Sequence, residues 1–182
     1  MTAVALIVGH NARAQGAVRV TDGRSEYDWC GDLAAAIRDH APGMYTVIRR
    51  QSHPSGYASE IRNAYQHADA LGVSATVELH FNGGPATATG TETLTSGTKG
   101  SLRLAGLIQP AMVGALGLRD RGIVTRGRAD RGGASLWSGR APAVLIEPYF
   151  GSREADCQAA DRHYAALTGA IHRACLAFIN GA

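Results

Sequence analysis

Short apolar runs alternate along this chain with longer segments whose apolar residues recur at helical spacing. The runs that read as strands cover residues 3–8, 45–49, 75–81, 91–95, 122–125 and 143–150. The segments with helical periodicity cover residues 26–40, 59–71, 102–116 and 156–179. Strands that alternate with helices predict an α/β fold, a single domain with a mixed, mostly parallel sheet flanked by helices on both faces.

Local signals mark where some of these elements begin and end. Ser25 is a suitable N-cap for the first helix, and Pro42-Gly43 follows its end. Pro110 lies inside a helical pattern and predicts a kink there. Residues 86–90 fit neither element and read as a surface loop, while the segment 127–140 is long enough for a connection that borders a site.

The composition indicates the number of domains and the class of protein. The 182 residues, 45% of them hydrophobic and 18% charged, suit one folded globular domain spanning residues 1–182. Lys and Arg number 18 against 15 Asp and Glu, a net charge of +3, which suits an anionic surface such as a cell envelope. The arginines are scattered without a basic block, so we expect no nucleic-acid partner.

The cysteines and the N-terminal residues indicate the cellular compartment in which the chain is made. Three cysteines without a CxxC pair fit a reducing environment, and Cys175 falls on the apolar stripe of the last helix, which predicts core packing. The first ten residues lack a basic region and a small-residue cleavage site, and no apolar run is long enough to cross a bilayer. We therefore expect a chain that is made in the cytoplasm and does not insert into membranes. We also expect a monomer, although no residue pattern determines the oligomeric state.

Three widely separated residues carry the candidate chemistry. His10 follows the first strand, His80 lies near the end of the third, and Glu26 opens the first helix. Ligands in α/β sheets bind at the carboxyl ends of strands, so these side chains converge if the two strands are neighbours. Two imidazoles and one carboxylate form the ligand set of a catalytic zinc that keeps an open position for water.

A further carboxylate, Glu147, ends the apolar run 143–147. Burial of a carboxylate among such residues costs free energy unless a partner or a catalytic role accounts for it. Glu147 is therefore either a catalytic group or one half of a buried ion pair.

Each candidate also has an ordinary structural reading. His10 can be a plain strand-end histidine and His80 a satisfied, partly buried one, while Glu26 in the first turn of a helix is favoured by the helix dipole. The remaining histidines read as surface or helix-face residues: His40, His53, His67, His163 and His172. Because no HExxH helix or other compact motif links the candidates, the residues alone leave both readings open.

The order of local motifs along nearly the whole chain resembles the zinc-dependent N-acetylmuramoyl-L-alanine amidases of the amidase-3 type. The segments that carry the resemblance are Gly9-His10, Glu26 on the first helix, Arg62 with Ala68-Asp69 on the second, Leu79-His80-Phe81-Asn82, Gly90-Thr91-Glu92-Thr93, Arg121-Gly122-Ile123 and residues 142–150. The resemblance implies that His10, Glu26 and His80 bind Zn²⁺ and that Glu147 is the catalytic carboxylate. It also implies peptidoglycan as the substrate, cut between muramic acid and the L-alanine of the stem peptide.

The chain departs from the family pattern at three places. Asn11-Ala12 follows the first histidine where the family usually has Gly-Gly. Glu78 stands two residues before His80 where the family usually has a small polar residue, and it can be either a partner that orients a metal ligand or a surface acid. Residues 148–152, Pro-Tyr-Phe-Gly-Ser, replace the segment that usually follows the catalytic glutamate.

A wall-cutting enzyme without an export signal resembles a phage or prophage endolysin, which acts on the wall after a separate pore releases it. Two rival functions remain open. One is a cytoplasmic zinc amidohydrolase that uses the same four residues on a soluble acylated amino acid or peptide. The other is a wall-binding module that keeps the fold without catalysis.

Overall fold

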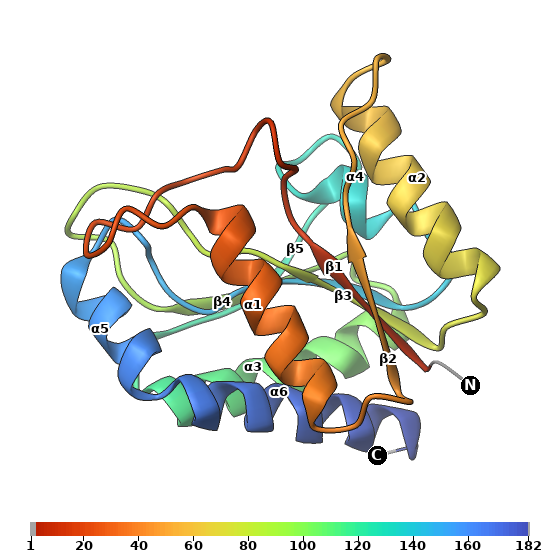
Figure 1. Ribbon diagram of the computed structural model, residues 1–182. Helices are drawn as coiled ribbons and strands as arrows, with labels where there is room; N and C mark the ends of the chain where they lie inside the picture. Colours follow the sequence, from red (N-terminus) through yellow and green to blue (C-terminus); the bar gives the residue numbers. More distant parts are fainter. Residues whose placement is uncertain (1–2, 182) are drawn as a thin grey trace.

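The computed structural model describes residues 3–181, which form one six-stranded sheet covered by helices (Figure 1). The strands are β1 (Val4–Val8), β2 (Tyr45–Arg49), β3 (Ala75–Leu79), β4 (Thr91–Thr95), β5 (Asp120–Thr125) and β6 (Ala143–Glu147). The helices are α1 (Glu26–Asp39), α2 (Tyr57–Ala70), α3 (Lys99–Leu116), α4 (Gly133–Leu136), α5 (Glu154–Arg162) and α6 (Tyr164–Ile179). Residues 1, 2 and 182, which the single-domain prediction includes, lie outside the described residues.

The strands lie in the order β2-β1-β3-β6-β4-β5. β1 pairs in parallel with β2 and β3, and β3 pairs in parallel with β6. β4 runs antiparallel to β6 and parallel to β5, so the direction reverses between β6 and β4. The carboxyl ends of three neighbouring strands, β1, β3 and β6, therefore meet at one edge of the sheet.

Two apolar layers sandwich this sheet, which confirms the predicted class. Along β1, Val4, Leu6 and Val8 belong to the larger core, which α1, α3, α5 and α6 also fill. Ala5 and Ile7 point to a smaller core under α2 and α4. Figure 1 shows α1, α3 and α6 gathered below the sheet, with α2 and α4 on the opposite side. All three cysteines are buried and free, and Cys175 packs in the larger core as predicted.

The helix predicted over residues 156–179 is two helices, so that prediction was wrong. The backbone of His163, with φ −107° and ψ 19°, interrupts the helix between α5 and α6. The two helices bury different partners: Cys157 of α5 lies against the carbonyl oxygens of Phe150 and Gly151, while α6 runs along α3 and α1. The chain turns at His163 because one straight helix could not reach both surfaces.

Other boundaries also differ from the prediction. β6 ends at Glu147 rather than at residue 150, because Pro148 lacks the N–H that would continue the ladder. α3 begins at Lys99, three residues earlier than predicted, with the Thr98 side chain accepting from the Ser101 N–H, and it continues through Pro110. Within the described residues, no helix combines the length and the apolar character that spanning a membrane requires.

Candidate active site

His10 stands directly after β1 and has an unusual backbone. Its φ of 64° makes it the one non-glycine residue of the described chain with positive φ. For a residue with a Cβ this left-handed conformation is uncommon and marks a site where the surroundings impose it. The bend takes the chain off the sheet and leaves the imidazole partly exposed at the carboxyl edge.

Glu26 is the first residue of α1, capped by Ser25, whose hydroxyl accepts from the Asp28 N–H at 3.2 Å. The Glu26 carboxylate is buried and accepts backbone hydrogen bonds from Ala17 at 3.1 Å and Phe81 at 3.3 Å. These two bonds hold the carboxylate in one orientation, with both oxygens available to further partners.

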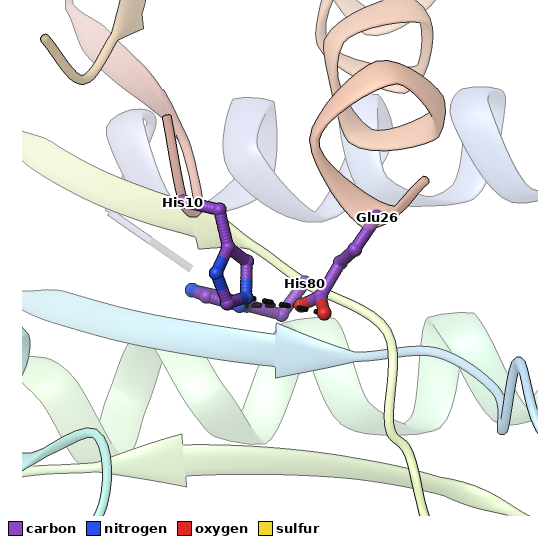
Figure 2. Close-up of side chains that lie close together, drawn as sticks. All are labelled: His10, Glu26 and His80. Carbon is purple, nitrogen blue, oxygen red and sulfur yellow. Dashed lines mark hydrogen bonds and ion pairs between the residues drawn. The ribbon is translucent and has the colours of Figure 1, made fainter. Parts of the chain in front are cut away.

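The structure brings His10, Glu26 and His80 together, as Figure 2 shows. His10 Nε2 lies 3.1 Å from Glu26 Oε2, and His80 Nδ1 lies 2.6 Å from Glu26 Oε1. One nitrogen from each ring and one carboxylate oxygen all lie within 4.8 Å of one another. The convergence expected from strand and helix ends is therefore present, because β1 and β3 are neighbours.

Electrostatics reflect how tightly these groups are packed. Burial opposes the ionised form of Glu26, but hydrogen bonds from His10 and His80 outweigh it and hold its pKa below the usual range. Burial also opposes the imidazolium of His80, yet hydrogen bonds to Glu26 and Glu78 raise its pKa to about 10. A carboxylate can only accept, so both ring nitrogens of His80 carry protons when no metal replaces one of them.

The donor set fits a zinc ion. Two ligands about 2.1 Å from a tetrahedral zinc lie about 3.4 Å apart, which is close to the 3.1 Å between His10 and Glu26 and longer than the 2.6 Å between His80 and Glu26. The chain also leaves room for the rings. A Cβ on Gly9 would lie 2.3 Å from the His80 ring, and one on Gly16 would lie 2.6 Å from both His10 and Glu26. Only glycine permits this approach, so the backbone is shaped around the three side chains.

Glu147 ends β6 at the same edge of the sheet and is 4% exposed. Its Oε1 lies 4.0 Å from Arg131 Nη2, and its Oε2 has no hydrogen-bond partner within residues 3–181. Burial is the main cause that raises the pKa of Glu147 from 4.5 to about 7. The ordinary reading, a tight buried ion pair, does not describe it, because the Arg131 guanidinium is distant and largely exposed, and the charge of His80 lowers the pKa of Glu147 by less than burial raises it.

Two adjoining cavities open at this edge. The smaller, of about 80 Å³, is lined by His10, His80 and Glu147 together with Arg131 and Ser135. The larger, of about 310 Å³, shares Glu147 and Arg131 with it and continues along β4 and β5. Arg121 and Arg126 also line that second cavity. The segment 127–140 borders both cavities as expected, and it contains α4, which the sequence pattern did not predict.

The sequence reasoning missed the residues that surround Glu78. Glu78 is completely buried and contacts Arg50, Tyr65 and His80, so it is not a surface acid. Arg50 follows the apolar strand β2 directly, and that position was the one signal in the sequence that could have marked it. The five other histidines are exposed or half-buried, as expected.

The chain matches a known protein family over most of its length. Residues 4–175 match the family described as N-acetylmuramoyl-L-alanine amidase, Amidase_3. The chain belongs to this amidase family. The match covers the four candidate residues and confirms the resemblance found in the sequence, and with it the prediction that the chain is an enzyme. No curated protein matches this amidase in sequence.

Solved structures share the amidase's fold at low sequence identity. The N-acetylmuramoyl-L-alanine amidase of Clostridium difficile 630 has a TM-score of 0.82 and 23% identity, over 99% of this chain and 98% of that one. The catalytic domain of CwlV from Bacillus (Paenibacillus) polymyxa var. colistinus gives 0.83 and 21%, over 99% of both chains. The catalytic domain of the CD27L endolysin, which targets Clostridia difficile, gives 0.81 and 21%, over 97% of both.

Proposed function

We propose that this chain is a zinc-dependent peptidoglycan hydrolase that cleaves the amide between N-acetylmuramic acid and the L-alanine of the stem peptide. One observation carries the proposal: two imidazoles that converge with the Glu26 carboxylate line a cavity that a buried glutamate, Glu147, also lines, in a chain of the amidase family. The substrate follows from the family, and the reaction type follows from the donor set and the glutamate.

His10, Glu26 and His80 would hold the zinc, which supplies a Lewis acid that polarises the scissile carbonyl and acidifies a water molecule. Glu147, whose Oε2 is free of hydrogen-bond partners among the described residues, takes the proton of the attacking water. The same carboxyl group then delivers this proton to the nitrogen of the departing L-alanine. Its raised pKa suits both halves of this transfer near neutral pH.

The larger cavity is the proposed place for the stem peptide. It begins at Glu147 and is lined by Arg121, Arg126 and Arg131. Arginine guanidinium groups match carboxylates in charge and geometry, and a peptide stem carries free carboxylates. The peptide side of the scissile bond would therefore extend along β4 and β5, with the glycan on the exposed side of His10.

Digestion of purified peptidoglycan sacculi tests this function. The proposal expects loss of turbidity and, by mass spectrometry, stem peptides with a free N-terminal L-alanine beside intact glycan strands. The rival cytoplasmic amidohydrolase would leave sacculi intact while cleaving soluble acyl-amino acids. The rival wall-binding module would sediment with sacculi and release nothing, and either result would contradict the proposal.

The endolysin role is a narrower proposal, supported by the shared fold with an endolysin catalytic domain. We propose synthesis in the cytoplasm and action on the wall after a separate pore opens the membrane. Expression in a susceptible bacterium should leave cells intact, and coexpression with a pore-forming protein should lyse them. Lysis by the chain alone would contradict this role and leave the amidase activity unaffected.

A further inference from the structure

Glu78 is a buried charge that the proposed reaction does not use. It lies on β3 two residues before His80, on the same side of the strand, and is 0% exposed. A carboxylate at such depth costs free energy unless its oxygens are paired. Its partners come from separate parts of the chain and include Tyr65, His80, Arg50 and Ser135.

The partners divide between the two oxygens of Glu78. Tyr65, on α2, donates its hydroxyl to Oε2 at 2.8 Å. His80 Nε2 lies 3.0 Å from Oε1, and Arg50 Nη1 lies 3.4 Å from the same oxygen. The opposite nitrogen of the His80 ring, Nδ1, faces Glu26 at 2.6 Å. The ring is thus held between a carboxylate of the proposed metal site and one outside it.

We propose that Glu78 is a positioning residue that accepts a hydrogen bond from His80 Nε2 and so presents Nδ1 to the zinc. The inference rests on the proposed zinc site and adds to it. A metal-binding histidine commonly donates its second N–H to a carboxylate, which fixes the ring and increases its strength as a ligand.

The alternative is that Glu78 merely neutralises Arg50, and the geometry speaks against it. Oε1 is nearer to the imidazole, at 3.0 Å, than to the guanidinium, at 3.4 Å. Arg50 Nη1 makes no hydrogen bond with any part of the described chain, so its contact with Glu78 is an ion pair only. Oε1 accepts its hydrogen bond from His80 Nε2.

Arg50 extends this arrangement to the first histidine. Its Nε donates to the backbone carbonyl of His10 at 3.3 Å, and its side chain is completely buried. His10 has the left-handed backbone, so this bond holds a conformation that would otherwise relax. Glu78 and Arg50 together support both histidines from beneath the site.

Zinc affinity tests the proposal without depending on activity. In competition with a chelator, Glu78→Gln should bind zinc at least about tenfold more weakly than wild type. A loss of about tenfold is the lower end of the range for removing a carboxylate that hydrogen-bonds a metal-binding histidine. The matched control is Asp156→Asn, a buried carboxylate that accepts from Thr89, Gly90 and Phe150, away from the three proposed ligands. Equal affinity in Glu78→Gln and wild type would overturn the inference.

A second measurement needs no variant and stands if Glu78→Gln does not fold. Nitrogen-15 NMR of the zinc-loaded wild type should show His80 protonated at Nε2 and coordinated through Nδ1. Coordination through Nε2 would overturn the inference and leave the zinc site intact. Failure of the wild type to bind zinc would overturn the proposed function and this inference with it.

Discussion

Glu147 is the residue on which the proposed chemistry depends most. Its carboxyl group is buried, lacks a hydrogen bond at Oε2 within residues 3–181, and lines the cavity that also contains His10 and His80. Glu147→Gln keeps the shape and removes the proton acceptor. We expect zinc and fold to be retained and hydrolysis of sacculi to fall at least about a hundredfold, the scale for loss of a general base.

The melting temperature, measured on the same sample, separates this role from a structural one. A glutamate that only stabilises the fold would, once replaced, lower the melting temperature and leave the folded fraction active. A variant with a lower melting temperature that still hydrolyses sacculi at the wild-type rate per folded molecule would contradict the catalytic role of Glu147.

The pKa of Glu147 also predicts how stability depends on pH. Burial raises this pKa from 4.5 to about 7, so between these values the folded chain holds a proton that the unfolded chain has lost. The resulting stabilisation is complete below pH 4.5 and disappears as pH rises through 7. In metal-free protein, the free energy of unfolding of wild type relative to Glu147→Gln should therefore decline across this window.

Chemical denaturation of both proteins at several pH values checks this decline. Both proteins contain Glu26, Glu78 and His80, so the difference reports Glu147 together with its electrostatic interactions with His80 and Glu26. A difference that stays constant from pH 4.5 to 7 would mean that Glu147 ionises like an exposed glutamate.

At the scale of single residues, the sequence predicted that His10, Glu26 and His80 converge, but not which residues surround Glu78. His10 and His80 follow apolar strands, and Glu26 opens a helix, so rules about strand ends were enough to expect their convergence. The partners of Glu78 were beyond such rules, since Arg50 reaches it from just after β2 and Tyr65 reaches it from α2, at unrelated spacing. Whether that carboxylate lay on the surface or inside depended on packing between elements.

The elements themselves were predictable where one face is strongly apolar. β2 and β4 match the predicted bounds, and α1 begins at Glu26 as expected. The predictions failed where tertiary contacts override local pattern. α5 and α6 separate at His163 because they cover different surfaces, and α4 is a single short turn without a periodic signal.

The end of β1 gives a prediction that belongs to this scale. Gly9→Ala places a Cβ about 2.3 Å from the His80 ring, so the ring has to move. We expect a loss of about 1–3 kcal/mol in the free energy of unfolding, typical of overpacking, together with weaker zinc binding. Thermal melting and zinc titration measure the two effects.

Gly106→Ala is the matched control for Gly9→Ala. Gly106 lies in α3 with nothing within 4 Å of an added Cβ, so alanine should stabilise the helix by up to about 1 kcal/mol and leave zinc binding unchanged. If Gly9→Ala bound zinc as tightly as Gly106→Ala, the close approach of β1 to His80 would have no part in forming the site.

The whole molecule determines what removal of the metal would do. Two apolar cores hold the sheet, and the three proposed ligands lie at its edge, outside both of them. Unlike a small zinc-dependent domain, this chain should keep its helices and sheet after chelation and lose only some stability. Circular dichroism before and after chelation checks this, and complete unfolding would assign the zinc a structural role.

The zinc content of purified wild type and of His80→Ala, by elemental analysis, tests the central claim most directly. The three proposed ligands predict about one zinc per wild-type chain. His80→Ala removes one of the two imidazoles that face Glu26 and should lose the zinc and the hydrolysis of sacculi together. A folded His80→Ala protein with its full zinc content would contradict the proposed site.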